Sequence, residues 1–396
     1  MSAQPRFSSR FVTVLTLIGV AVGLGNVWRF PYMMGKYGGS AFLLIYLLFT
    51  ILFAIPALMG EITLGKVSRS GPIGAFRQAL GKILGGTVGI VLLTTILVAS
   101  SYYAVIIANV LYSTYFAVHF GFSTETMDGY QAGLENGTLQ YAISIVIFIV
   151  CLVIIGRGLH RGIEWISKIF VPFFLVAIIY LIYQALSLEG SGSYFLAFLQ
   201  PDFSQLEPLH VFAALGQAFY SLSLGGTFMV VYGSYVKESE SIPQIAGYTA
   251  LGDVSAALLT SLFVVPTILV FQLDITSGPR LIFNTLPYLF GEMSGGNWIG
   301  MLFLAALSCV ALLSLVAALE VVRSCLRDLL GSRWNQLWIL ILIGVVEIAL
   351  AFPSAYDANL IGLLDLVFGS GMQVLGSGLA LAANKGYQPD SWRVEM

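Results

Sequence analysis

Charged side chains are scarce in this sequence: Asp, Glu, Lys and Arg together make up 10% of its 396 residues. Soluble globular proteins carry about 25% charged residues, because their surfaces must be hydrated. The composition therefore excludes a soluble enzyme, a nucleic-acid-binding protein and a disordered scaffold. A formal net charge of −2 also leaves no basic surface that would attract a polyanion.

Cysteine and histidine are equally rare, with three residues of each. The cysteines, Cys151, Cys309 and Cys325, all lie within apolar stretches, which argues against a disulfide framework, and no pair has the spacing of metal ligands. The histidines fall at expected membrane edges or in loops and share no helix face with a pair of carboxylates. Hydrolysis needs a nucleophile with its base, or a bound metal, so the sequence predicts that the protein is not an enzyme.

Long apolar runs take the place of the missing charge: 58% of the residues are hydrophobic, and the mean hydropathy is +0.90. A transmembrane helix needs about 20 apolar residues to cross a bilayer. The sequence predicts an all-α membrane protein, with ten transmembrane helices in a single domain of residues 1–396. The ten segments are approximately 11–34, 40–64, 86–118, 139–156, 166–187, 209–236, 244–273, 298–326, 335–352 and 360–383.

Lysine and arginine are distributed unevenly between the two sides of these ten helices. If the N-terminus is cytoplasmic, only Arg29, Lys36 and Arg280 fall in the outer half, and the other 15 of the 18 basic residues lie on the inner side. Cytoplasmic loops of membrane proteins carry such an excess of basic residues. The pattern predicts a multi-pass protein of the inner (plasma) membrane with both termini in the cytoplasm.

Glycines interrupt the first and the sixth of the predicted helices at mid-bilayer depth, within residues 22–26 (VGLGN) and 221–226 (SLSLGG). Close helix packing through small residues would also explain glycines at this depth. However, the two interruptions open successive sets of five helices, about residues 11–187 and 209–383. Because five is odd, the second set must run inverted relative to the first. Paired broken helices in inverted repeats are typical of secondary transporters with a binding site at the midplane.

Six ionisable residues are expected within the helices, where an isolated charge costs at least about 2.5 kcal/mol. Together they favour an ion or proton pathway, because most of them should face a wet interior or a partner. For one of them, Glu347, the sequence is equally consistent with a proton-binding site and with a buried polar contact. The six are Arg29, Glu61, Asp253, Glu320, Glu347 and Asp365.

Long motifs stand at both broken helices: AVGLGNVWRFP at residues 21–31 and QAFYSLSLG at residues 217–225. With shorter matches that follow in order along nearly the whole chain, they resemble the neurotransmitter:sodium symporters, the LeuT-like family. The resemblance implies the LeuT fold, a 5+5 inverted repeat with broken helices 1 and 6. It also implies sodium-coupled import of an amino acid by alternating access. Family members usually have eleven or twelve helices, so ten helices leave the oligomeric state open, a monomer included.

The resemblance implies a first sodium site at the broken helices, formed by the carbonyl of Ala21 and the side chains of Asn26, Ser221 and Asp253. Chloride-dependent members carry a serine where this chain has Ala257. A carboxylate at Asp253 would supply the negative charge that chloride supplies elsewhere. Sodium is therefore the expected cofactor, and chloride is not expected to be required. The alternative interpretation places Asp253 at the start of a helix, at the cytoplasmic rim.

A second sodium site is implied by the carbonyls of Gly19, Val22 and Ala311 and the hydroxyl of Ser314. The family usually supplies another hydroxyl at the next position, which is Leu315 in this chain. Hard cations prefer a nearly complete shell of oxygens, so the missing ligand would weaken this site. The sequence leaves open whether a water or a shifted backbone completes the shell, or whether another cation, a proton included, drives transport.

For the substrate, the resemblance implies a site between the unwound helices. Gly23 stands where monoamine carriers hold an aspartate, which leaves room for an α-carboxylate bound by the Tyr103 hydroxyl and first-helix amides. Gly226 and Leu315 make the expected side-chain pocket roomy and apolar, which favours a large hydrophobic or aromatic amino acid. The predicted substrate-binding residues are Val20, Ala21, Gly23, Gly25, Ala99, Tyr103, Tyr220, Ser221, Ser223, Gly226, Leu315 and Leu319.

Two gates are implied as well. Arg29 and Asp365 are similar to an outer ion pair that closes over the substrate beneath an aromatic lid. On the inner side, Arg6 or Arg10 is expected to pair with Asp328. The expected partners are a small amino-acid-like substrate and the lipid bilayer, and no nucleic acid.

Two alternatives to sodium-coupled import stay open because of the change at Leu315. The first is a proton-coupled or weakly coupled carrier of an amine or an amino-acid derivative. The second is a transport-incompetent sensor or channel of the same fold. Counterflow of labelled substrate in proteoliposomes distinguishes a carrier from a sensor, and a current that does not saturate indicates a channel.

Overall fold

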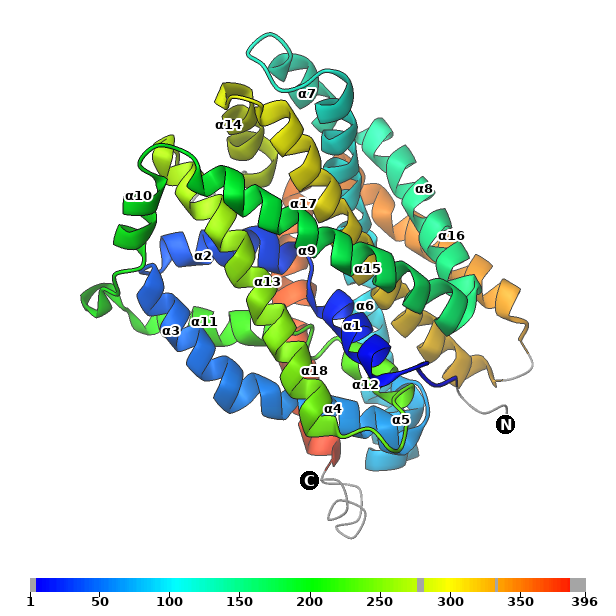
Figure 1. The fold of residues 1–396 in the computed structure, drawn as a ribbon. Coiled ribbons are helices and arrows are strands. Elements are labelled where there is room, and N and C mark those ends of the chain that lie inside the picture. The colour runs from blue at the N-terminus through cyan, green and yellow to red at the C-terminus, as the bar shows by residue number, and fades with distance from the viewer. Residues whose placement is uncertain (1–4, 276–280, 332–333, 385–396) are drawn as a thin grey trace.

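The computed structural model describes residues 5–275, 281–331 and 334–384, and within these ranges the chain forms helices and turns, with no strand. Figure 1 shows long helices crossing a single bundle, with the start of α1 (Arg10–Ala21) and the end of α18 (Met372–Asn384) on its lower side. Four basic residues that entered the orientation prediction lie outside the described ranges: Arg280, Arg333, Lys385 and Arg393.

The first half of the chain forms nine α-helices, α1 to α9. After α1 they are α2 (Phe30–Lys36), α3 (Ser40–Phe49), α4 (Ile55–Ser68), α5 (Pro72–Leu80), α6 (Lys82–His119), α7 (Met127–Leu134), α8 (Gly137–Gly156) and α9 (Glu164–Leu186). Three π-helical turns lead into later helices without leaving the helical path, namely η1 (Gly25–Arg29), η2 (Thr50–Ala54) and η3 (Leu159–Ile163).

The second half contains both very long and very short helices. They are α10 (Ser191–Phe198), α11 (Pro208–Ser221), α12 (Phe228–Ser234), α13 (Ile242–Val270), α14 (Leu286–Glu292), α15 (Gly296–Leu330), α16 (Gln336–Tyr356), α17 (Ala358–Leu364) and α18. A π-helical segment, η7 (Asp365–Gly371), joins α17 to α18. Side-chain amides begin two helices, because Asn136 caps α8 and Asn335 caps α16 by accepting hydrogen bonds from backbone N–H groups.

All ten segments predicted from hydropathy fall on helices. Eight helical spans are long and apolar enough to cross a membrane, and α1 with the helix of residues 25–36 makes a ninth that bends by 62°. The remaining predicted segment, 209–236, forms α11 and α12, which are 14 and 7 residues long. Neither reaches the length of a spanning helix alone. The count of ten spans and the inverted repeat therefore stay predictions.

The two helix breaks leave the helical path differently. After α1, Val22 adopts an extended conformation, with φ −70° and ψ 120°. After α11, three residues within five have positive φ: Ser223 (52°), Gly225 (83°) and Thr227 (59°). Positive φ is rare and costly for residues with a side chain. The second break is consequently held by its surroundings, and not by local preference.

A buried carboxylate from α4 stabilises the second helix break. Glu61 accepts a hydrogen bond from the backbone N–H of Gly225 at 2.7 Å. In a bilayer, a backbone amide that is freed by unwinding has no water to bind. A protein group must therefore accept its hydrogen bond. Gly225 is also pressed against α18, since a Cβ placed on it would lie 1.4 Å from the carbonyl oxygen of Gln373.

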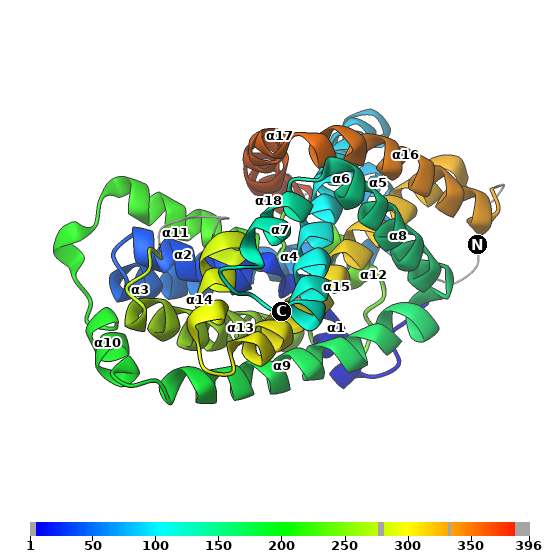
Figure 2. The same ribbon diagram turned by 90° about the horizontal axis from the view of Figure 1, so that it is seen from above.

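The centre of the bundle is built around α6 and α15, which pack against each other and place α8 and α9 against α15. Seen from above, α9 runs along one edge of the molecule, and α8 and α16 lie side by side at another (Figure 2). Both helix breaks are thereby held inside the bundle, where α12 contacts α4 and α1 contacts α13.

Candidate functional site

A cavity of about 90 Å³ lies between the two helix breaks. Both breaks, α6, α15 and the η7–α18 segment contribute to its wall. The lining residues are Ala21, Gly23, Leu24, Gly25, Asn26, Ile96, Ala99, Ser100, Tyr102, Tyr103, Tyr220, Ser221, Ser223, Phe228, Ser314, Ala318, Asp365, Gly369 and Gln373.

Eight of the twelve predicted substrate-binding residues line this cavity: Ala21, Gly23, Gly25, Ala99, Tyr103, Tyr220, Ser221 and Ser223. Val20, Gly226, Leu315 and Leu319 are not among the lining residues. Val20 lies next to it all the same, since its carbonyl accepts a hydrogen bond from the Ser223 hydroxyl at 3.2 Å. The assignment of all twelve to substrate binding stays a prediction.

The expectation that Gly226 makes the pocket roomy needs correction. A Cβ placed on Gly226 would lie 2.4 Å from the ring atom Cε2 of Phe228, and Phe228 itself lines the cavity. Leu315, the other residue on which that expectation rested, is fully buried away from the cavity. The wall beside Gly226 is therefore aromatic, because the ring two positions later takes the space that the glycine leaves.

Gly23 lies in the break after α1, beside residues of α15 and α6. A Cβ at this position would be 2.8 Å from the hydroxyl oxygen of Ser314 and 3.4 Å from that of Tyr103. Two hydroxyl groups thus occupy the place of the missing side chain. They are hydrogen-bond donors aimed at the first helix break, which is the arrangement that a bound carboxylate needs.

Three buried side chains from three helices meet beside the cavity. The Asn26 amide nitrogen donates to Oδ1 of Asp253 at 2.6 Å and to the Ser221 hydroxyl at 3.0 Å, and that hydroxyl donates to Oδ2 of Asp253 at 2.7 Å. The amide oxygen of Asn26 accepts from the N–H of Gly23 at 3.1 Å. Asp253 is fully buried in the middle of α13, so its interpretation as a helix-start residue at the rim is wrong.

The chemistry of this cluster suits an alkali cation. It offers a carboxylate, an amide oxygen and a hydroxyl, all of them hard oxygen donors. No cation contacts Asp253 among the described residues, so its charge is free to be balanced by a bound ion. Within the same ranges no three His, Cys, Asp or Glu side chains gather as metal ligands.

The residues assigned to a second sodium site lie where α15 meets the end of α1. The Ser314 hydroxyl is 3.3 Å from the carbonyl oxygen of Val22, so a hydroxyl and a freed carbonyl face each other. Ala311 is fully buried, and a Cβ placed on Gly19 would lie 3.2 Å from the Leu313 side chain. The structure brings the Ser314 hydroxyl and the Val22 carbonyl together, and the function of all four residues as sodium ligands stays a prediction.

The expected outer ion pair is not formed in this structure. No nitrogen of Arg29 lies within 4 Å of a carboxylate oxygen of Asp365 among the described residues. The Arg29 guanidinium instead lies 4.1 Å from the ring centroid of Tyr220, and Asp365 accepts a hydrogen bond from the Tyr102 hydroxyl at 3.1 Å. Tyr102, Tyr220 and Asp365 all line the cavity, so both charges stand close to its edge.

A family model described as "Sodium:neurotransmitter symporter family" matches residues 4–131 and 120–376, which is most of the chain. The chain belongs to the sodium:neurotransmitter symporter family. The resemblance found in the motifs is thereby confirmed. Membership implies use of sodium, and it confirms that the protein is a membrane transporter and not an enzyme.

Individual relatives of the symporter agree with this membership. An uncharacterized sodium-dependent transporter, YhdH of Bacillus subtilis, is 29% identical over 90% of this chain and 81% of its own length. An uncharacterized sodium-dependent transporter of Haemophilus influenzae is 27% identical over 86% of this chain and 77% of its own. The crystal structure of MhsT in complex with L-phenylalanine superimposes with a TM-score of 0.85 at 29% identity, covering 98% of this chain and 94% of that one.

Eight residues line the symporter's cavity that the sequence did not single out. Two of them, Ile96 and Ser100, share a face of α6 with Ala99 and Tyr103, since Ile96 stands three positions before Ala99 and Ser100 three positions before Tyr103. Ile96 and Ser100 could therefore have been predicted from their spacing to Ala99 and Tyr103. Gly369 and Gln373 follow Asp365 at steps of four in the same way. The remaining four are Leu24, Tyr102, Phe228 and Ala318.

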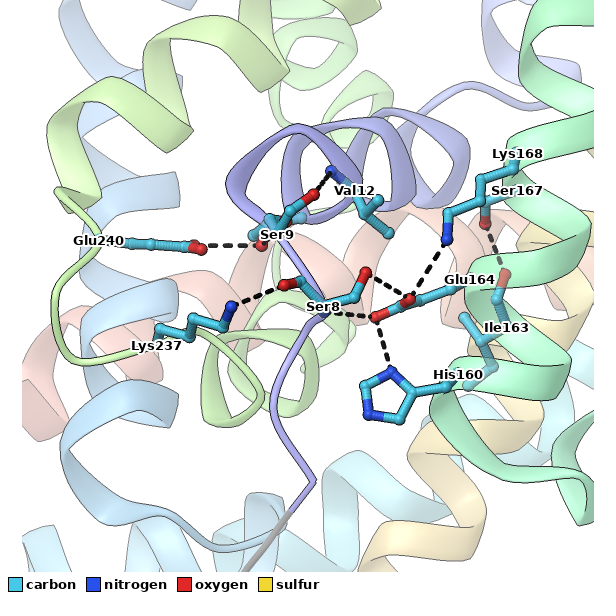
Figure 3. A network of polar contacts seen from close by, with 11 residues as sticks. Ser8, Ser9, Val12, His160, Ile163, Glu164, Ser167, Lys168, Lys237 and Glu240 are labelled. Atoms are coloured by element: carbon cyan, nitrogen blue, oxygen red, sulfur yellow. Dashed lines mark hydrogen bonds and ion pairs between the residues drawn. The ribbon is translucent and has the colours of Figure 1, made fainter.

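A second polar network in the symporter surrounds the segment before α1 (Figure 3). Ser8 donates to the carboxylate of Glu164 twice, through its N–H and its hydroxyl, both at 2.8 Å. The Lys237 ammonium donates to the Ser8 carbonyl at 2.7 Å, and Lys168 lies 3.6 Å from Glu164. His160 also contacts this carboxylate, at 3.1 Å. The segment is therefore pinned to α9 and to the chain that follows α12.

The prediction that Arg6 or Arg10 pairs with Asp328 at the inner side is wrong. Arg6 pairs with Glu238 at 2.7 Å, and the Arg10 guanidinium lies over the ring of Tyr248. Asp328 accepts hydrogen bonds from two backbone N–H groups at the start of α5 instead, at 3.2 and 2.8 Å. Contacts with backbone amides carry no sequence signal, which explains why the partner of Asp328 was missed.

Arg29→Ala is expected to lower transport by about tenfold or more. The guanidinium carbon lies 4.1 Å from the ring centroid of Tyr220, and a partly desolvated cation–π contact is worth about 1–2 kcal/mol. Arg29→Lys keeps the charge but loses the planar group, so an intermediate rate is expected. The measurement is initial uptake of labelled substrate into proteoliposomes. Lys36→Ala is the matched control, because Lys36 is exposed over the rings of Tyr32 and Tyr37. Equal losses in both variants would contradict a specific function of Arg29.

Proposed function

We propose that the protein is a sodium-coupled secondary active importer of an amino acid with a large hydrophobic or aromatic side chain, which works by alternating access. The convergence of Asn26, Ser221 and Asp253 at the edge of the cavity carries this proposal. These residues come from the first break, from the end of α11 and from α13, so one bound cation would tie three helices together.

The coupling between sodium binding and substrate binding follows from the position of the two helix breaks. A bound sodium ion supplies positive charge at the wall of the cavity. Asp253 balances that charge, and Asn26 and Ser221 hold the carboxylate in place through two hydrogen bonds. The freed N–H groups of the first break and the Tyr103 hydroxyl would bind the substrate carboxylate, since helix N-termini attract anions. Carbonyls at Ala21, Tyr220 and Ser223 would bind the substrate amine.

The substrate class rests on the aromatic wall. Phe228 and Tyr220 face the cavity with Ile96, and a large apolar side chain is the group that such a surface stabilises. The amino acid in the MhsT structure, L-phenylalanine, supports the same class.

The carboxylate of Asp253 removes the need for chloride in this proposal. The protein lies in the plasma membrane with both termini in the cytoplasm, as two inverted repeats of about residues 11–187 and 209–383.

Reconstitution tests the proposed function directly. Proteoliposomes with an inward sodium gradient are expected to accumulate labelled L-phenylalanine or a similar amino acid, and a sodium ionophore abolishes the accumulation. Potassium or choline in place of sodium serves as the control. Uptake that follows an inward pH gradient without sodium would replace sodium coupling by proton coupling. A current that does not saturate with substrate would identify a channel.

A further inference from the structure

One carboxyl group in the bundle takes no part in the sites above. Glu347 lies in the middle of α16 and is fully buried. Its Oε1 atom is 2.6 Å from the hydroxyl oxygen of Ser100 on α6, and its Oε2 atom has no hydrogen-bond partner. Glu347 therefore has one polar contact where an ionised carboxylate would need several.

No positive charge compensates this carboxyl group. The helices packed against α16 are α6, α8, α15 and α17. None of their charged or titratable side chains lies within hydrogen-bond or ion-pair distance of Glu347 in the part of the chain that the structure describes. These side chains are Lys82, Tyr102, Tyr103, Tyr112, Tyr115 and His119 on α6, Tyr141 and Cys151 on α8, and Cys309, Glu320, Arg323, Cys325, Arg327 and Asp328 on α15.

A buried charge without a partner is strongly unfavourable inside a membrane protein. As a neutral acid, Glu347 gains a donor instead. Its O–H group donates to the Ser100 oxygen, and the Ser100 hydroxyl donates to the carbonyl of Ile96, which lies 2.6 Å away. Each hydroxyl has one hydrogen. The two contacts of the Ser100 hydroxyl, with Ile96 and with Glu347, can therefore both be hydrogen bonds at the same time only when Glu347 carries a proton. With Glu347 ionised, Ser100 must turn its hydrogen from Ile96 to the carboxylate.

Ser100 connects this acid to the transport site, since both Ser100 and Ile96 line the central cavity. We propose that Glu347 is a proton-binding site that exchanges its proton with the cavity through Ser100 and thereby makes substrate affinity depend on pH. In release, the carboxyl proton passes to the Ser100 oxygen while the proton of Ser100 passes to a water molecule in the cavity. A carboxylate and a hydronium ion result.

The sign of the pH dependence follows from the charge. An ionised Glu347 places a negative charge behind the wall and turns the Ser100 hydroxyl away from Ile96. The negative charge disfavours an amino-acid carboxylate in the cavity, because like charges repel. Substrate affinity is therefore highest at low pH, where Glu347 is neutral, and falls as Glu347 ionises. This step rests on the proposed transport function, whereas the protonation of Glu347 does not.

Infrared difference spectroscopy of the purified, substrate-free protein tests the protonation. Subtracting the spectrum of Glu347→Gln from that of the wild type at neutral pH is expected to leave the C=O stretch of a protonated carboxylic acid. The band should weaken as pH rises, and Ser100→Ala should shift its frequency by removing the acceptor. Glu292→Gln, at an exposed glutamate, is the matched control and should remove no such band. A carboxylate band at Glu347, or an acid band that ignores pH, overturns the proposal.

Binding of L-phenylalanine as a function of pH tests the connection to the cavity. Affinity of the wild type is expected to fall about fivefold or more as Glu347 ionises, a usual size for coupling between two sites. In Glu347→Gln the affinity should stay at its low-pH value, with sodium dependence retained. Identical pH profiles in both proteins overturn the connection while leaving sodium-driven uptake intact. Failure to bind or transport any amino acid refutes the proposed function, and the infrared result still decides the proton site.

Discussion

Asp253→Ala is expected to abolish sodium-dependent transport. The substitution removes the only charge of the cluster and leaves the Ser221 hydroxyl without its acceptor, whereas the Asn26 amide keeps the Ser221 oxygen and the backbone carbonyl of residue 253. Each buried donor left unpaired costs about 1–3 kcal/mol, and the lost charge–ion interaction adds a similar amount. The apparent sodium affinity should therefore fall by about a hundredfold or more, as measured by sodium titration of substrate binding.

Asp253→Asn tests the effect of the negative charge separately from the effect of the side chain's size. An amide keeps the size of the side chain and one acceptor, so the fold should survive, with transport lowered or newly responsive to added chloride. Asp128→Asn, at an exposed aspartate outside the bundle, is the matched control. Normal chloride-free transport by Asp253→Asn would show that the carboxylate does not take the place of chloride.

Gly225→Ala is expected to have the largest effect on stability of any alanine substitution at the second break. The new Cβ would lie 1.4 Å from the carbonyl oxygen of Gln373, and the residue would keep a φ of 83°. Backbone must move to relieve this overlap, and the move would pull the Gly225 amide from Glu61. Loss of more than about 4 kcal/mol is expected, a range reached only by severe disruptions. Thermal unfolding in detergent measures it.

Gly216→Ala provides the control for this substitution. Gly216 lies within α11, and a Cβ there would meet no atom within 4 Å. Alanine is favoured over glycine in a helix by about 1 kcal/mol, so this variant should be as stable as the wild type or slightly more stable. A Gly225→Ala protein that unfolds at the same temperature as Gly216→Ala would contradict the close packing of the second break against α18.

The sequence predicted those parts of the site whose signals are local. Glycines marked both helix breaks. The residues Asn26, Ser221 and Asp253 meet as the family resemblance implied, although 195 and 227 positions separate the contacting pairs that involve Asn26. Hydropathy located every long helix within a few residues. The breaks and the long helices depend on residue type and spacing along one element, which a single sequence displays, whereas the meeting of the three motif residues was implied by the family resemblance.

Other contacts depend on side-chain directions that a sequence does not display. Phe228 covers Gly226 because Thr227, between them, has a φ of 59° and redirects the chain. Arg6 finds Glu238, and not Asp328, because the segment before α1 crosses to the chain after α12. Arg29 and Asp365 were expected to form an ion pair, but each contacts a different tyrosine. Opposite charges in a sequence indicate attraction, and backbone geometry decides which pairs meet.

The extended backbone at Val22 separates α1 from the cluster of Asn26, Ser221 and Asp253, so that a rotation at this point would move the far end of α1. The helix has 12 residues and is therefore about 18 Å long. A rotation of about 10° at Val22 would carry its far end by about 3 Å, while Asn26 beyond Val22 stays in place. That travel exceeds what the 2.8 Å bonds between Ser8 and Glu164 can follow. A rotation of α1 at Val22 would therefore have to break the contacts that hold the segment before α1 to α9.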